Sequence, residues 1–151
     1  MMMKNFEKDF VERTKSIIEN QRVQQDEKYE VTLLLNCLLG LISVAVENTD
    51  LMDSNETPFM KTCVEKLDEM GVLTKTTDEK KTFRAIKNAL SHVHIELGNY
   101  EGKINKVTFG DKRDRNAKDY HTILEFTVKQ LREYALFIAD LHLERCDNKT
   151  K

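Results

Sequence analysis

The 151-residue sequence has few residues that interrupt helices, with one proline, five glycines and no tryptophan. Hydrophobic residues make up 40% and charged residues 33%, a balance that suits helices with charged outer faces. This composition leaves little room for disorder outside the two ends. Because the length suits one domain and supports a continuous apolar core, we predict a single domain over residues 1–151.

The sequence also lacks a strong net charge, the formal value being -2. A molecule with this charge has no long-range attraction for polyanions, which argues against a protein that coats DNA. Any contact with nucleic acid must therefore come from a local basic site.

Paired cysteines and long apolar runs are missing as well. Cys37, Cys63 and Cys146 are odd in number, far apart and without C-x-x-C spacing, which is typical of reduced thiols in a cytosolic protein. The most apolar run, residues 33–46, is shorter than the ~20 residues of a bilayer span, so we interpret it as a buried helix. Residues 1–5 do not resemble a secretory signal, and we expect a cytoplasmic protein with no membrane partner.

Apolar residues at helical spacing predict an amphipathic first helix over residues 5–24. They are Phe6, Phe10 and Ile17, with Val11 and Ile18 beside them. Arg13 falls within this apolar stripe. Two interpretations stay open for it: the stem packs while the charged end reaches water, or the side chain lies near a shared functional site.

The second predicted helix, residues 29–47, is apolar almost all round and must be covered on more than one side. Asn36, Gly40 and Ser43 fall at i, i+4 and i+7, a stripe of small groups that lets another helix approach closely. An interface between two copies of the chain and burial inside a monomeric bundle both explain this pattern.

Capping signals place two further helices. Thr57 and Pro58 supply an N-cap and a proline at the first helical position, and Gly71 stands where a left-handed C-terminal cap favours glycine. Thr76, followed three residues later by Glu79, is a capping-box pattern that opens a fourth helix.

The pattern changes after the fourth helix. Gly98, Asn99 and Gly102 indicate turns, and residues 104–109 have the composition of a short strand. We interpret residues 110–119 as a charged loop. Its four cations either contact phosphate or are simply solvated, and the three aspartates among them favour solvation.

A second capping box, formed by Thr127 and Gln130, opens the last helix. The predicted apolar side of this helix carries Val128, Leu131, Ala135, Ile138 and His142.

The fourth helix has one apolar and one polar side, if residues advance by roughly 100° each. The apolar side carries Phe83, Ile86, Ala89, Leu90 and Val93. The polar arc collects two cations, an amide, a hydroxyl and an imidazole, from Arg84, Lys87, Asn88, Ser91 and His92. This arc is either a solvated helix face or a site for chemistry.

The polar arc has the groups that metal-free RNA cleavage requires. The reaction needs a base for the 2′-hydroxyl proton, cationic donors for the phosphate and an acid for the leaving oxygen. His92 can transfer protons near neutral pH, while Lys87 and Arg84 supply positive charge. Asn88 either bonds to the ribose or orients the imidazole, and Ser91 adds a further RNA-binding hydroxyl.

The stretch from Asn88 to His92 resembles the second half of the HEPN motif (higher eukaryotes and prokaryotes nucleotide-binding), which has arginine, a short spacer and histidine. Residues 10–14 and 29–41 resemble the opening helices of a plasmid- and phage-associated bacterial branch of that family. The resemblance implies a homodimer whose motif helices face each other and form one composite ribonuclease site. It also implies proton transfer by His92, with Asn88 as its polar neighbour.

The resemblance further suggests that Glu30 supports the motif, although a carboxylate in the first turn of a helix is also favoured by the helix dipole alone. Directly before Asn88, where the family usually carries arginine, this sequence has Lys87. Lysine keeps the charge but lacks the planar fork that binds phosphate through two hydrogen bonds. Arg84, one turn earlier on the same face, is a candidate substitute.

Other chemistries find little support in the sequence. His92 and His94 have the spacing of two metal ligands on a strand, with His121 or Glu96 to complete a site, but on a helix their rings point nearly opposite ways. There is no glycine-rich phosphate loop, no G-x-S-x-G and no cysteine–histidine nucleophile spacing. We therefore predict no metal and no cofactor.

Together these observations predict an all-α fold, an up-and-down bundle of about five helices with a small hairpin or irregular insertion before the last helix. We expect it to dimerise through the second and fourth helices. The leading functional hypothesis is a metal-independent endoribonuclease, a toxin or antiphage effector with RNA as substrate and an antitoxin or regulatory protein as partner. The alternative is a non-catalytic module that binds RNA or a partner protein.

Overall fold

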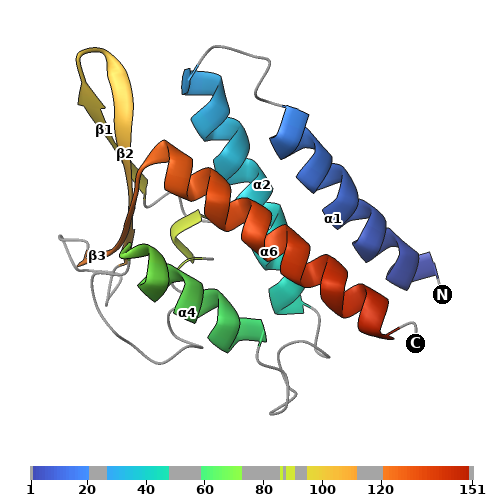
Figure 1. Ribbon diagram of the computed structural model, residues 1–151. Helices are drawn as coiled ribbons and strands as arrows, with labels where there is room; N and C mark the ends of the chain where they lie inside the picture. Colours follow the sequence, from blue (N-terminus) through green and yellow to red (C-terminus); the bar gives the residue numbers. More distant parts are fainter. Residues whose placement is uncertain are drawn as a thin grey trace. The chain divides into compact units, whose positions relative to one another are not determined.

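A computed structural model of the chain describes residues 2–20, 27–47, 59–72, 86, 88–90, 95–111 and 121–149. The elements within these ranges (Figure 1) are α1 (Met2–Asn20), α2 (Glu27–Glu47), α4 (Phe59–Met70), β1 (Ile95–Tyr100), β2 (Lys103–Asp111), β3 (His121–Phe126) and α6 (Val128–Lys149). Residues 86 and 88–90 are also helical.

The described part of the chain is mostly helical, but it contains a three-stranded antiparallel sheet. The fold is therefore not purely all-α as predicted. The insertion before the last helix is this sheet, because β1 and β2 pair with each other and β3 then pairs with β2.

The chain divides into two compact units. One comprises Met1–Thr57 and Arg132–Lys151, and the other comprises Pro58–Leu131. The first unit contains α1, α2 and most of α6, and the second contains α4, the sheet and the first residues of α6. The single domain over residues 1–151 stays a prediction.

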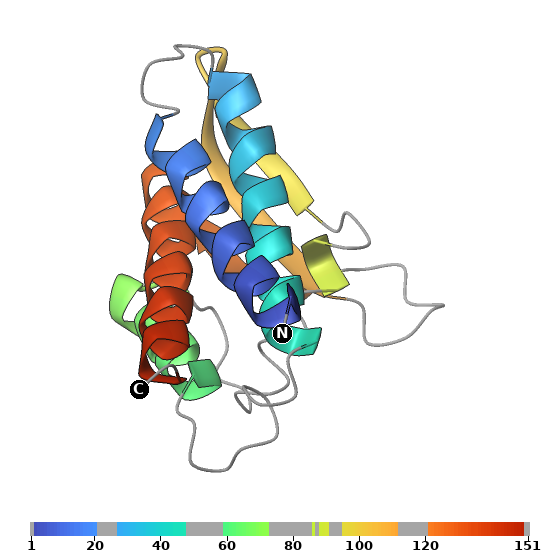
Figure 2. The same ribbon diagram turned by 90° about the vertical axis from the view of Figure 1, so that its right-hand side faces the viewer.

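In the first unit α1, α2 and α6 lie side by side in both views (Figures 1 and 2). Gly40 is where α1 comes close to α2, because a β-carbon built there would lie only 2.8 Å from the Phe10 Cζ. The small residue thus serves a close approach of two helices within one chain. The buried apolar side chains of this unit include Val11, Ile18, Leu34, Leu38, Leu41, Ile42, Ala135, Ile138 and Ala139.

The second helix follows its prediction closely, beginning at Glu27 and ending at Glu47. Burial of Val31, Leu34, Leu38 and Leu41 agrees with the interpretation of its apolar run as a buried helix. No helix among the described residues is long and apolar enough to cross a bilayer.

The last helix also has the apolar side that the sequence predicts. His142 on that side is only 3% exposed, and its Nε2 lies 3.2 Å from the carbonyl oxygen of Leu41 on α2. A buried imidazole needs such a polar partner, because burying a polar group without a hydrogen bond costs free energy. His142 is therefore a structural residue of the first unit.

In the second unit α4 ends at the glycine that the sequence indicates. Gly71 adopts φ 71°, its N–H donates to the Asp68 carbonyl (3.0 Å), and the Val72 N–H donates to the Leu67 carbonyl (3.2 Å). These are the two hydrogen bonds of a Schellman cap. The Val72 carbonyl then accepts the Glu125 N–H at 3.0 Å, which ties the end of α4 to β3.

The capping box at the start of α6 is confirmed. The Thr127 N–H donates to the Gln130 Oε1 (2.9 Å), and the Gln130 N–H donates to the Thr127 Oγ1 (3.1 Å). The Gln130 Nε2 also donates to the Met70 carbonyl at 3.2 Å, so one side chain caps the start of α6 and the end of α4.

The sheet corrects the prediction of turns at Gly98 and Asn99. Both residues lie within β1. The turn predicted at Gly102 is confirmed, because the chain reverses at Glu101 and Gly102, whose φ angles are 52° and 79°. The register between β1 and β2 shifts between Gly98 and Asn99, so the residues that favour turns coincide with an irregularity in the ladder.

The predicted strand over residues 104–109 is confirmed as part of β2. Its inward side chains pack with those of β3, and the Phe109 and Phe126 rings have centroids 5.4 Å apart. The core of the second unit includes Phe59, Cys63, Leu67, Ile86, Leu90, Val107, Phe109, Leu124 and Phe126.

Candidate functional site

The described residues of the fourth helix agree with its predicted apolar and polar sides. Ile86 and Ala89 are fully buried, Leu90 is 6% exposed, and Asn88 is exposed. Because the four positions fix the rotation of this helical segment, they place Asn88 on its outward side.

The other members of the polar arc, Arg84, Lys87, Ser91 and His92, lie outside the described residues. Their roles, and the role of Asn88 beside His92, stay predictions. The capping box predicted at Thr76 lies outside the described residues as well.

Glu30 belongs to the first unit, where its Oε1 accepts a hydrogen bond from the Arg132 Nη2. The two side chains are 19% and 13% exposed, so most of this ion pair is shielded from water. The Arg132 Nη1 also donates to the Ile18 carbonyl at 3.2 Å. One guanidinium on α6 therefore joins the last turns of α1 to the first turns of α2.

Arg132 was not predicted as the partner of Glu30. The residue lies directly after Leu131, at the edge of the apolar side of the last helix. Arginine at such an edge is a signal of a partly buried ion pair, because the guanidinium fork can satisfy a carboxylate and a carbonyl together.

Arg13, for which a place near a shared functional site was one of two interpretations, is exposed on α1. It has no hydrogen bond or ion pair within the described ranges. Its charge is therefore available to a ligand or to another chain.

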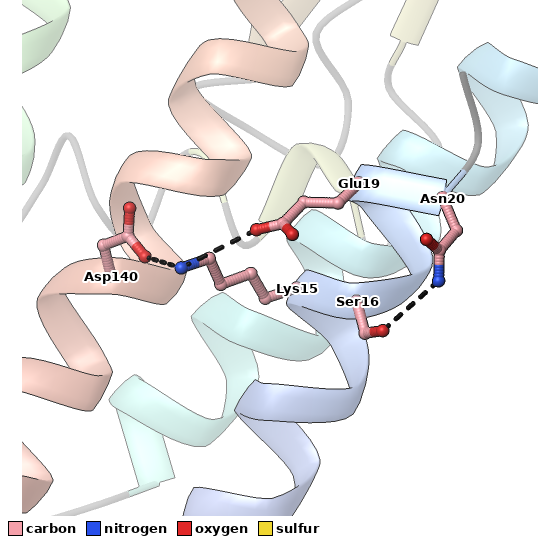
Figure 3. A network of polar contacts seen from close by, with 5 residues as sticks. All are labelled: Lys15, Ser16, Glu19, Asn20 and Asp140. Carbon is pink, nitrogen blue, oxygen red and sulfur yellow. Dashed lines mark hydrogen bonds and ion pairs between the residues drawn. The ribbon is translucent and has the colours of Figure 1, made fainter.

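Lys15 on the same helix is already engaged, as Figure 3 shows. Its Nζ lies 2.6 Å from the Asp140 Oδ1 and 3.6 Å from the Glu19 Oε1. The hydrogen bond and the charge of Asp140 raise the pKa of Lys15 above its ordinary 10.5. This lysine joins α1 to α6 and is a poor candidate for binding phosphate.

The described cysteines have no sign of chemistry. Cys37 and Cys63 are both buried thiols. Burial raises the pKa of the Cys37 thiol, which disfavours the reactive thiolate.

In the part of the chain that the structure describes, no three His, Cys, Asp or Glu side chains gather as a metal site would require. His92 and His94 lie outside that part.

The described elements define a mostly helical protein with a three-stranded sheet before its last helix. The chain matches the HEPN pEK499 p136 family over residues 1–149, and it belongs to that family. The resemblance noted at residues 10–14, 29–41 and 88–92 is thereby confirmed for the family. No curated protein and no solved structure matches the chain.

Proposed function

We propose that this chain is a metal-independent endoribonuclease of the HEPN type, which cleaves RNA at a site shared by two copies of the chain. The observation that carries the proposal is family membership over residues 1–149 together with the motif from Asn88 to His92. The outward position of Asn88 supports it, since Asn88 is the described member of the predicted polar arc, and the neighbouring Ile86 and Leu90 are buried.

In the proposed reaction the ribose 2′-oxygen attacks the adjacent phosphorus and the bond to the 5′-oxygen breaks. A base accepts the 2′-hydroxyl proton and an acid donates a proton to the leaving 5′-oxygen, so the products are a 2′,3′-cyclic phosphate and a 5′-hydroxyl. His92 from each copy supplies these proton transfers near neutral pH.

Lys87 and Arg84 stabilise the charge that develops on the phosphate, and Ser91 and Asn88 bind the RNA. Because a lysine binds phosphate as a point charge, Lys87 orients the phosphate less strictly than an arginine would.

The biological role we propose is that of a toxin or antiphage effector acting on RNA in the cytoplasm, restrained by an antitoxin or another regulatory protein. The support for this role is the resemblance of residues 10–14 and 29–41 to the plasmid- and phage-associated branch of the family.

One sequence feature favours a second candidate, a non-catalytic module that binds RNA or a partner protein. It is Lys87 at the position where the family usually has arginine. Loss of bidentate phosphate binding weakens the stabilisation of the transition state more than it weakens electrostatic attraction to RNA.

Cleavage of a mixed RNA pool in the presence of EDTA separates the two candidates. We expect the wild-type protein to cut RNA under these conditions, and His92→Ala to lower the rate by at least about 100-fold, the usual contribution of a general acid or base. Lys87→Arg should raise the rate.

The matched control is His94→Ala, which removes a second imidazole two residues further along the chain and should leave cleavage unchanged. RNA binding without cleavage by either the wild-type protein or Lys87→Arg would favour the non-catalytic module. Equal loss of activity in the His92 and His94 variants would indicate a general disturbance of the helix.

A further inference from the structure

The outer side of α1 exposes an apolar line of side chains. Phe6 is 65% exposed and Ile17 is 48% exposed, whereas large apolar side chains elsewhere in the described chain are mostly buried. Phe10 is half-buried, and its ring stacks on that of Phe6 with centroids 6.3 Å apart. With Arg13 between Phe10 and Ile17, these residues follow i, i+4, i+7 and i+11, which places them on one side of a helix. We call these four residues the Phe6–Ile17 stripe.

The surface of α2 next to the stripe is uncharged. Phe10 covers Gly40, and Asn36, one turn before Gly40, is exposed. The sequence between Glu30 and Glu47 contains no charged residue, so this outward part of α2 carries no charge. An uncharged surface of this kind suits contact with protein, because RNA binding needs cations at the surface.

The stripe is complementary to itself in an antiparallel arrangement. If two α1 helices cross about a twofold axis between positions 11 and 12, Phe6 meets Ile17 of the second copy and Phe10 meets its Arg13. The exposed Asp9 then lies beside that same Arg13. Within the described ranges neither Asp9 nor Arg13 has an ion pair, so both charges are available for this contact.

We infer that the Phe6–Ile17 stripe is a surface through which two copies of this chain associate, with α1 of each copy packed antiparallel on the other. The inference rests on the proposed homodimer and adds α1 to the second and fourth helices, through which the sequence predicts that the two copies meet. Each interface contains two apolar pairs of Phe6 with Ile17, and two clusters in which Arg13 contacts a phenyl face and a carboxylate.

The stripe alone is about 16 Å long, from 11 steps of about 1.5 Å along a helix. A single helix pair of that length buries less than the roughly 800 Å² per partner of a standard interface. The uncharged part of α2 beside Gly40 therefore supplies the rest of the contact.

The test is the oligomeric state of the full chain, measured by sedimentation velocity over a range of concentrations. We expect a wild-type dimer whose dissociation constant rises at least about tenfold in Arg13→Asp and in Asp9→Arg, because each places like charges opposite each other. The double variant carrying both reversals restores the opposite charges and should restore the dimer. Ile17→Glu should also give monomers.

The matched control is Glu12→Arg, a charge reversal at an exposed position of α1 outside the stripe, which should remain dimeric. Far-UV circular dichroism of each variant checks that the helices are intact. A monomeric wild type, or a dimer that survives Ile17→Glu and both single reversals, would overturn the proposal. So would a double variant that folds but stays monomeric.

The same samples separate this proposal from the proposed function. If the wild-type protein cuts RNA but the stripe variants remain dimeric, the proposed interface is refuted and the proposed ribonuclease activity stands. If the dimer responds to the charge reversals as expected but cuts no RNA, the proposed interface is supported and the proposed ribonuclease activity is refuted.

Discussion

The ion pair between Glu30 and Arg132 offers the sharpest test of how the first unit is held together. Arg132 on α6 donates to the Glu30 carboxylate at the start of α2 and to the Ile18 carbonyl near the end of α1. Arg132→Met removes the charge and both hydrogen bonds but keeps an apolar stem of similar length. Glu30→Gln keeps the shape and one acceptor oxygen but removes the negative charge.

The burial of the pair sets the expected magnitude. Removing one partner of a fully buried ion pair costs about 3–5 kcal/mol, whereas an exposed pair contributes about 0–1 kcal/mol. With side chains 13% and 19% exposed, this pair lies between these limits. We expect a loss of about 2–3 kcal/mol in the free energy of unfolding for Arg132→Met, which also orphans the Ile18 carbonyl, and about 1–2 kcal/mol for Glu30→Gln.

Urea denaturation of the two single variants and the double variant measures these losses and their coupling. Because the second substitution no longer strands an unpaired charge, the double variant should lose about 1 kcal/mol less than the sum of the single losses. Additive losses, or single losses below about 0.5 kcal/mol as for an ordinary surface substitution, would refute the reasoning.

The Glu30→Gln protein also tests the suggestion that Glu30 supports the catalytic motif. If its main role is the bond to Arg132, samples kept well below their unfolding transition should cut RNA at nearly the wild-type rate. A large loss of activity in fully folded Glu30→Gln protein would instead assign this carboxylate to the site.

Two further predictions concern single contacts. Gly71→Ala should lower the free energy of unfolding by about 1–2 kcal/mol in urea denaturation, because φ 71° is a left-handed conformation that alanine disfavours. An added β-carbon meets nothing within 4 Å, so steric contact does not add to the loss. An unchanged free energy of unfolding would contradict the Schellman cap. Lys15→Met should cause a small, salt-sensitive loss of thermal stability, because it removes the contact with Asp140. That contact raises the lysine pKa above 10.5, so its contribution to stability is complete at lower pH and disappears as the pH rises through the raised pKa. The difference in thermal stability between Lys15→Met and the wild type should therefore vanish in strongly alkaline buffer. A difference that persists there would contradict the assignment.

Local signals in the sequence correctly predicted α2 and the end of α4 and the start of α6, whereas α1 begins and ends earlier than the predicted residues 5–24. The apolar periodicity of α2, the glycine at Gly71 and the reciprocal bonds of Thr127 with Gln130 each involve residues within one or two turns of a helix. The stability of a cap or of an amphipathic face depends on such neighbours, so both features can be recognised in the sequence.

The sheet depended on partners that local signals do not specify. Gly98 and Asn99 favour turns by themselves, but pairing with Lys106 and Ile104 of β2 keeps them within a strand. The sequence reasoning also missed β3, because its register is set by contacts with β2.

In the candidate site, too, local features could be predicted from the sequence but a long-range contact could not. The rotation of the fourth helix could be predicted, because Ile86, Asn88 and Leu90 obey one local period. The bond between Glu30 and Arg132 could not, because it joins residues 102 positions apart in the chain.

The central claim is that His92, contributed by each of two copies, carries out the proton transfers of RNA cleavage without a metal. The most direct measurement is the rate at which purified wild-type and His92→Ala proteins convert RNA to fragments ending in 2′,3′-cyclic phosphate in EDTA. We predict cleavage by the wild type and a rate at least about 100-fold lower for the variant. Equal rates for the two folded proteins would contradict the claim.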